Sequence, residues 1–229
     1  MRTIGLLGGM SWESTAEYYR LANEGVRDRL GGLHSARLLL HSVDFAEVAE
    51  LQRQDRWDDA GQLLGQAAKG LEAAGAELLL ICTNTMHLVA DQVQAAVSVP
   101  LLHIVDTTAD AVRAAGLTRV GVLGTRFTME QPFYRERMAT HGVDVLVPDA
   151  GDRDEIHRVI FEELCRGVVR DESREAYRRV IERLVAAGAQ GVVLGCTEIE
   201  LLVGPQDSAV PVFPTTRLHV EAALRAAGV

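Results

Sequence analysis

The sequence predicts an α/β fold made of two pseudo-symmetric domains, each with a mainly parallel sheet flanked by helices. Two observations lead to this prediction. Short, continuously apolar segments alternate with amphipathic segments over all 229 residues, and apolar strands between helices are typical of a parallel sheet that is covered on both faces. Similar segments also recur in the same order in both halves of the chain, which indicates a duplicated unit.

The first half begins with an apolar strand that ends in two glycines, and the alternation continues from there. We expect, in order, strand Ile4–Leu7, helix Ser14–Arg27, strand Leu38–Val43, helix Ala60–Ala74, and strands Leu78–Ile81 and Leu101–Val105. The helices carry apolar residues at helical spacing, so each can cover one face of the sheet.

The second half repeats this plan. We expect strands Val120–Leu123, Val143–Val147, Val192–Leu194 and Val212–Phe213, one long helical stretch over Arg153–Ala187, and a last helix over Arg217–Ala227. The last helix is long enough to return and pack on the first half. We therefore assign residues 1–100 and 215–229 to the first domain and residues 101–214 to the second.

Internal similarity is the most specific signal in the chain. The segment LEAAGAELLLICTNTM at residues 71–86 matches LVAAGAQGVVLGCTEI at residues 184–199 with a shift of 113 positions, so Thr83 corresponds to Cys196. Two further pairs have nearly the same shift: IGLLG at 4–8 with VGVLG at 120–124, and Val-Pro at 99–100 with Val-Pro at 210–211. Three matches in one order predict that the halves share a fold.

The composition excludes several classes of partner. The chain has 32 acidic and 23 basic residues and a net charge of −9, which argues against nucleic acid because phosphate binding needs a positive surface. No apolar run is long enough to span a bilayer and no signal peptide is apparent, so we expect no membrane association. Three scattered cysteines do not make a disulfide framework, which predicts a cytoplasmic protein. The seven histidines show no metal-ligand spacing, so we expect no metal.

Polar residues gather where four of the predicted strands end. Ligands of open α/β sheets bind beyond the carboxyl ends of the strands, and two facing domains would present these ends to one shared cleft. The first pair of loops is Gly8-Gly9-Met10-Ser11 and Gly124-Thr125-Arg126, where glycines let backbone N–H groups approach an anionic ligand. The same glycines also suit a tight turn, and Ser11 suits a helix N-cap.

The second pair of loops is Cys82-Thr83-Asn84-Thr85 and Gly195-Cys196-Thr197-Glu198. Threonine and asparagine often cap helices, and most cysteines pack as small hydrophobes. We expect such packing of Cys82, which continues an apolar strand. Cys196 differs because its counterpart in the repeat, Thr83, is also a small polar residue at such a turn, so we expect Cys196 to carry chemistry.

Together the segments GLLGGMSWEST, CTNTMH and GCTEI resemble the aspartate/glutamate racemase family, and most closely its aspartate-racemase branch with its broad-specificity members. The glutamate-racemase branch typically opens with Asp-Ser-Gly and has His where this chain has Glu198. The resemblance covers nearly the whole chain. It implies an amino-acid racemase that needs no cofactor, acts on aspartate, glutamate or a similar small polar amino acid, and moves the Cα proton between two opposed side chains in the cleft between its domains. We also expect a homodimer.

The chain departs from the family at the first catalytic position. Relatives usually have a cysteine directly before the Asn-Thr of the first motif, where this chain has Thr83, with Cys82 one residue earlier. Neighbouring strand residues point to opposite faces, so only one of the two is expected to reach the substrate. The repeat pairs Thr83 with Cys196, so we assign the catalytic pair to Thr83 and Cys196. Some aspartate racemases have a lysine at the position of Cys165, so the contacts with the substrate carboxylate on that side stay open.

Racemisation needs a base on one face of Cα and an acid on the other. A thiol suits this role because its pKa, about 8.5 when unperturbed, is readily lowered by N–H groups and positive charge. Cys196 would act as a thiolate and Thr83 would return a proton. The expected substrate-binding residues are Met10 through its backbone, Gln52 or Arg53, Asn84, Thr85, Thr125, Thr197 and Glu198. His87 is expected to cap or pack beside the first motif.

Two alternatives remain open at this point. The same scaffold with one cysteine resembles decarboxylases of malonate-type acids, in which a single acid protonates an enolate. A two-domain cleft could also bind an amino acid without reacting with it. Cα proton exchange indicates the racemase, release of carbon dioxide indicates the decarboxylase, and binding without either indicates a sensor.

Overall fold

The computed structural model describes residues 1–229 and confirms the predicted α/β class. The chain contains two four-stranded parallel sheets with the strand orders β2-β1-β3-β4 and β6-β5-β7-β8. It divides into two compact units: a first unit of Met1–Ile104 and His219–Val229, and a second unit of Val105–Leu218. The boundaries that we predicted, after residues 100 and 214, fall a few residues before the observed crossings of the chain.

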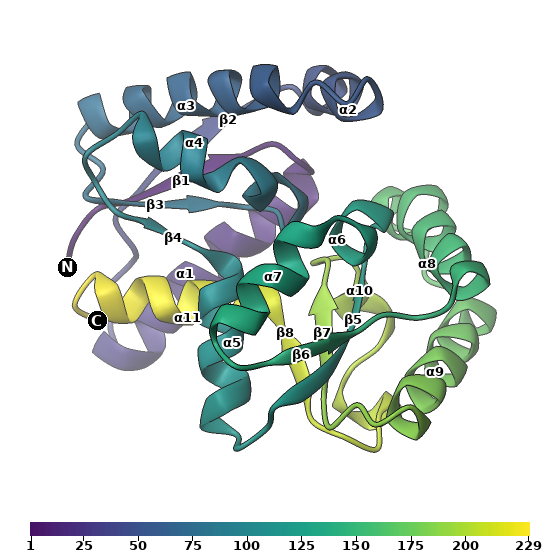
Figure 1. Cartoon of the computed structure of the whole chain (residues 1–229). Coiled ribbons are helices and arrows are strands. Elements are labelled where there is room, and N and C mark those ends of the chain that lie inside the picture. The colour runs from purple at the N-terminus through teal and green to yellow at the C-terminus, as the bar shows by residue number, and fades with distance from the viewer. The chain divides into compact units, whose positions relative to one another are not determined.

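The first unit contains the first sheet, its helices and most of the last helix of the chain (Figure 1). Its elements are β1 (Ile4–Gly8), α1 (Trp12–Leu30), β2 (Leu38–Ser42), α2 (Phe45–Arg53), α3 (Trp57–Ala73), β3 (Leu78–Ile81), the 3₁₀ helix η1 (Thr85–Val89), α4 (Ala90–Ala95), β4 (Leu101–Leu102) and α11 (Thr215–Ala226).

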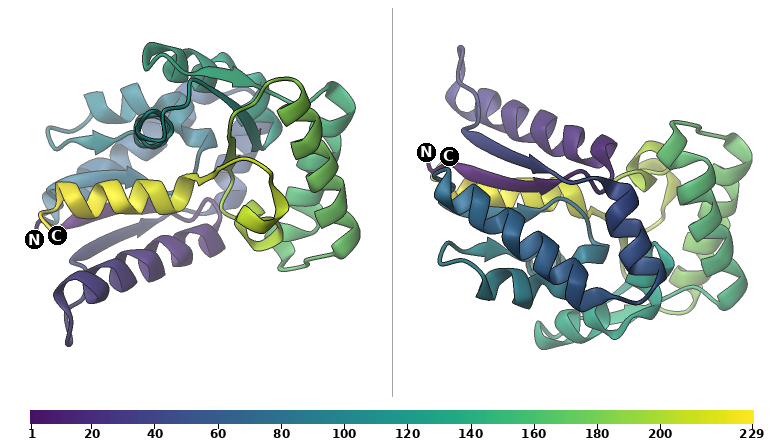
Figure 2. Two further views of the ribbon diagram at one scale, coloured as in Figure 1. Left: turned by 90° about the horizontal axis from the view of Figure 1, so that it is seen from below. Right: turned by 90° about the horizontal axis from the view of Figure 1, so that it is seen from above.

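Alternating residues of the central strands divide the core of the first unit into two layers. Leu7 and Ile81 point to the side covered by α3 and α4, whereas Leu6 and Leu80 point to the side covered by α1 and α11 (Figure 1). This alternation has the period of two that a strand imposes. The last helix therefore completes the core of the unit in which the chain began. The two chain ends meet there, because the N–H of Arg2 donates to the carbonyl of Ala227 at 2.8 Å (Figure 2).

The second unit repeats the order of the first. Its elements are α5 (Ile104–Ala114), β5 (Arg119–Gly124), α6 (Arg126–Glu130), α7 (Pro132–Thr140), β6 (Asp144–Leu146), α8 (Ala150–Glu162), the 3₁₀ helix η2 (Leu164–Arg166), α9 (Asp171–Ala186), β7 (Val192–Gly195), α10 (Ile199–Leu202), the 3₁₀ helix η3 (Pro205–Asp207) and β8 (Val212–Pro214). In each half the helix after the fourth strand carries the chain into the other unit: α5 follows β4, and α11 follows β8.

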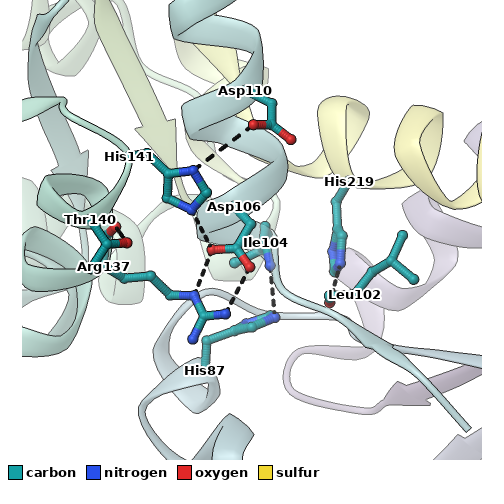
Figure 3. Close-up of polar contacts among 9 residues, drawn as sticks. All are labelled: His87, Leu102, Ile104, Asp106, Asp110, Arg137, Thr140, His141 and His219. Carbon is teal, nitrogen blue, oxygen red and sulfur yellow. Dashed lines mark hydrogen bonds and ion pairs between the residues drawn. The ribbon is translucent and has the colours of Figure 1, made fainter.

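Helices α8 and α9 pack on one side of the second sheet through Ile160, Ile181 and Leu184, against Leu123 and Leu194 of the central strands. An ion-pair cluster links α5 to α7 within the same unit. The carboxylate of Asp106 accepts two hydrogen bonds from the guanidinium of Arg137, at 2.6 and 2.7 Å, and contacts His141 Nε2 at 2.9 Å (Figure 3).

Three sequence predictions are wrong in detail. The strand expected over Leu101–Val105 is limited to Leu101–Leu102, because its pairing with β3 stops there and Ile104 already begins α5. The helical stretch expected over Arg153–Ala187 is broken between α8 and α9 by η2 and by Gly167, whose φ of 71° lies in the left-handed region. Six helices were not predicted: α2, α4, α5, α6, α7 and α10. No helix in either unit combines the length and the apolarity needed to cross a bilayer.

Candidate active site

The loops that follow β1 and β3 are neighbours in the first unit. The two strands pair directly and in parallel, with Leu7 opposite Ile81. The loops that follow them therefore begin at the same edge of the sheet. The hydroxyl of Ser14, in the first turn of α1, donates to the carbonyl of Cys82 at 3.1 Å. The N-terminus of α1 is therefore tied to the loop that carries Thr83.

Cys82 and Thr83 lie in different environments, as expected. The Cys82 side chain has no exposed surface and packs in the core layer of Leu6, Leu80 and Tyr18. Burial also raises the pKa of its thiol, so it stays protonated. Thr83 is half-buried and follows Cys82 directly at the sheet edge. The prediction that Cys82 packs as a small hydrophobe is confirmed.

The residues after Thr83 turn at once into η1. Asn84 and Thr85 are both buried there. Gln52, on α2, is buried and its amide nitrogen lies 3.1 Å from the sulfur of Met86, in the same 3₁₀ helix. Arg53 is exposed and forms an ion pair with Glu50. Of the two residues suggested for the distal end of the substrate, Gln52 is thus the one beside the loop.

The glycine loop after β1 is built as a tight turn. The N–H of Gly9 donates to Thr15 Oγ1 at 2.8 Å. It is thus engaged within the protein, whereas we expected the N–H groups of this loop to face a ligand. Gly9 has a φ of 92°, and a side chain there would meet the carbonyl of Val43 at 2.2 Å. Ser11 caps α1 through Ser14, and Met10 is buried in the core.

The second unit places Cys196 and Thr125 by the same geometry. Strands β5 and β7 pair with Gly124 opposite Gly195, and the two residues follow directly after this pair. The hydroxyl oxygen of Thr125 accepts a hydrogen bond from the N–H of Thr128 and caps α6. Cys196 is half-buried, like Thr83 in the first unit.

Glu198 lies directly against the thiol of Cys196. The sulfur donates to Glu198 Oε2 at 2.9 Å, and the Glu198 side chain is buried. Burial, and then the neighbouring Glu198 carboxylate, raise the pKa of Cys196 well above its ordinary value. Our expectation of a lowered thiol pKa is therefore wrong for the free protein: Cys196 is a thiol whose proton points at a carboxylate. Glu198, expected to bind substrate, is the partner of the thiol.

Thr197 connects the same loop to the helix that leaves the second unit. Its Oγ1 lies 2.6 Å from Oγ1 of Thr216, in the first turn of α11, and Thr216 is buried. Thr215 beside it donates to the carbonyl of Leu194 at 2.9 Å. Thr215 and Thr216 were not predicted, because they lie outside every motif.

His87 packs beside the first motif, as predicted. Its side chain is 3% exposed and forms two hydrogen bonds, one to the carbonyl of Thr83 at 2.8 Å and one from the N–H of Ile104 at 3.1 Å. The rings of His103 and His219 lie 4.6 and 5.6 Å from that of His87. No group of three or more His, Cys, Asp or Glu side chains is arranged to hold a metal ion.

A family model described as Asp/Glu/hydantoin racemase matches residues 7–223, which include both loops after the third strands. The chain belongs to the Asp/Glu/hydantoin racemase family. The family that the three motifs predicted is thereby confirmed.

Solved structures and a curated relative agree with this membership. A Yersinia pestis protein, assigned provisionally as an Asp/Glu racemase, is 53% identical over the full length of both chains, with a TM-score of 0.95. An aspartate racemase homologue from Pyrococcus horikoshii is 35% identical, also over both full chains, with a TM-score of 0.89. The broad-specificity amino-acid racemase RacX of Bacillus subtilis is 21% identical over 93% of this chain and 92% of its own.

Proposed function

We propose that the protein is a cofactor-independent amino-acid racemase for aspartate, glutamate or a similar small polar L-amino acid, in which Thr83 and Cys196 move the Cα proton. Family membership supports the racemase chemistry. One observation carries the choice of residues: Thr83 and Cys196 are the first half-buried polar side chains after the third strand of each sheet. This equivalence supports a pair that acts on opposite faces of one Cα.

The Cys196–Glu198 contact supports a route for making the thiolate. The thiol proton can pass to Glu198 Oε2, 2.9 Å away, which leaves a thiolate beside a neutral carboxylic acid and does not change the charge of the pair. The ammonium group of a bound amino acid favours the thiolate further. The thiolate then takes the Cα proton and becomes a thiol again.

Thr83 completes the reaction from the other face. Its hydroxyl delivers a proton to the carbanion, and the resulting alkoxide takes a proton from water. Glu198 releases to solvent the proton that it had accepted, which neutralises the hydroxide and restores both residues. A hydroxyl is a weak base near neutral pH, so the reverse removal of a proton by Thr83 is slow. We therefore propose that L-amino acids, whose Cα proton faces Cys196, are the better substrates. The residues proposed to hold the substrate are Asn84, Thr85, Thr125 and Thr197, with Gln52 toward its distal end.

Deuterium uptake at Cα tests this function. Each amino acid is incubated with the protein in deuterated water, both enantiomers are separated by chiral chromatography, and their deuterium content is followed by mass spectrometry. We expect uptake and D-product with aspartate, glutamate or a close analogue, and neither with Cys196→Ala. A Cys196→Ala variant that keeps more than a few per cent of the exchange would refute the assignment.

Two parallel measurements separate the racemase from the alternative activities. Substituted malonates are tested in parallel for release of carbon dioxide, and binding of each amino acid is measured by calorimetry. Carbon dioxide release without amino-acid exchange would identify a decarboxylase. Binding with neither reaction would identify a sensor.

We also propose that the protein forms a homodimer through the outer face of α1. Trp12, Tyr19 and Leu30 lie on one stripe of this helix, because spacings of 7 and 11 residues return to the same face. All three are well exposed, Trp12 at 69%. Sedimentation equilibrium of the wild type and of Trp12→Lys/Tyr19→Lys tests this: we expect a dimer and a monomer, and a monomeric wild type would refute it.

A cytoplasmic location is part of the same proposal. Cys82, Cys165 and Cys196 are all free thiols, and a reducing compartment keeps the proposed base in its active form. Cell fractionation of a tagged protein tests the location.

A further inference from the structure

His87 joins two points of the first unit that are far apart in sequence. The carbonyl of Thr83 can only accept a hydrogen bond and the N–H of Ile104 can only donate one, so Nδ1 of His87 carries the proton and Nε2 accepts. Figure 3 shows the bond between the imidazole and Ile104. A neutral ring with both nitrogens engaged thus links the Thr83 loop to the first residue of α5.

Ile104 is the last residue of the first unit before the chain enters the second. His219 marks the return crossing, and its Nε2 donates to the carbonyl of Leu102 at 2.9 Å (Figure 3). Its Nδ1 accepts from the hydroxyl of Tyr18 at 2.8 Å. Each crossing of the chain is therefore held by a buried histidine. Only His87 also contacts the loop that carries a proposed catalytic group.

The second unit contains a corresponding link. There the loop after β7 is joined to the first turn of α11 by the 2.6 Å contact between Thr197 and Thr216. In both halves, then, the loop that carries the proposed acid or base is connected to the start of the helix that leaves the unit. The residue types differ between the halves, but the connected places are the same.

We propose that His87 is a positioning residue for Thr83, an inference that rests on the proposed function. A threonine hydroxyl is one rotatable bond from the backbone, so its place is set by the peptide that His87 holds. Proton transfer needs the hydroxyl within about 3–3.5 Å of Cα, and a displacement of about 1 Å can cost on the order of a hundredfold in rate. Loss of either His87 hydrogen bond, to the Thr83 carbonyl or from the Ile104 N–H, should therefore impair proton delivery by Thr83 more than proton removal by Cys196.

Two substitutions each remove one of the two hydrogen bonds of His87. In His87→Asn the amide nitrogen replaces Nδ1 and keeps the Thr83 bond, but the side chain is too short to reach Ile104. In His87→Gln the amide group replaces Nε2 and keeps the Ile104 bond, but loses the one to Thr83. His219→Gln is the matched control, because it alters an equally buried histidine of the same cluster that does not contact the Thr83 loop.

The readout is the ratio of D-product formed to deuterium found in the recovered L-substrate, with aspartate or glutamate in deuterated water. This ratio compares delivery of a proton or deuteron to the carbanion by Thr83 with exchange of the Cα proton by Cys196. A general loss of stability lowers both rates and does not change the ratio. We expect it to fall at least about tenfold in the folded His87 variants and to keep its wild-type value in His219→Gln. Near-ultraviolet circular dichroism establishes which variants are folded.

A wild-type ratio in either folded His87 variant would overturn the proposal, as would an equal fall in His219→Gln. Failure of the proposed function gives a different pattern, since the wild type would then show neither exchange nor D-product.

Discussion

Acidification should destabilise the first unit through His219. This side chain has no exposed surface, and burial lowers the pKa of its imidazole from 6.5 to about 4, against the opposing effect of its bond to the Leu102 carbonyl. Between pH 6.5 and about pH 4, His219 is protonated in the unfolded chain but not in the folded chain. His219 thus contributes stability that is present above pH 6.5 and is lost as the pH falls toward 4.

The size of the effect follows from the two pKa values. The free energy of unfolding should fall by about 2 kcal/mol between pH 7.5 and pH 5 because of this group alone, and by about 3 kcal/mol below pH 4. His219→Gln removes the titration and keeps a donor for Leu102. Its own cost at neutral pH, from the lost Tyr18 bond, is about 1 kcal/mol.

The two tryptophans, Trp12 and Trp57, both lie in the first unit, so urea titrations followed by tryptophan fluorescence report on that unit. The fall in stability between pH 7.5 and pH 5 should be about 2 kcal/mol smaller in His219→Gln than in the wild type. Carboxylates such as Glu163, whose pKa is lowered, lose their contribution only at more acidic pH, and His157 titrates in both proteins. An equal fall in both proteins would show that His219 is protonated without unfolding.

Three further predictions concern the candidate site. Cys82→Ala should cost about 1 kcal/mol of stability and keep activity, as for a small buried hydrophobe, whereas Thr83→Ala should abolish D-product; the reverse result would place Cys82 at the substrate. Glu198→Gln should shift the alkylation of Cys196 by iodoacetamide, followed by peptide mass spectrometry, to lower pH, because it removes the carboxylate that raises the thiol pKa; an unchanged profile would contradict this. With L-substrate in deuterated water, wild-type exchange into the recovered L-form should outpace D-product, and Thr83→Cys should narrow the gap; equal rates in both proteins would exclude Thr83.

The repeat and the apolar strands predicted the two parallel sheets and the polar loops that follow their strands, because both depend on local pattern. Cys82 and Thr83 were separated correctly for the same reason: the period of two along β3 continues into them. The break at Gly167 was missed because apolar residues run on at helical spacing through Leu164 and Cys165, and the left-handed turn has only one glycine as its signal.

Electrostatics and long-range hydrogen bonds could not be predicted in this way. The pKa of Cys196 depends on how deeply the fold buries it and on the direction of the Glu198 side chain, and neither is encoded in spacing. The role of His87 depends on Ile104, seventeen positions away, being brought to its ring by the pairing of β4 with β3. Such contacts arise from tertiary structure.

The last helix has a consequence for synthesis on the ribosome. Val220, Ala223 and Leu224 belong to the same core layer as Tyr18 and Leu80, so the first unit cannot complete this layer until residues 219–229 have emerged. Residues 105–218, by contrast, form one continuous stretch. The unit that is translated second therefore can fold first, in reverse of the usual order in which domains mature. A message truncated before codon 219 would release a chain in which one apolar face of the first sheet is uncovered. Such a chain would be a substrate for chaperones and proteases.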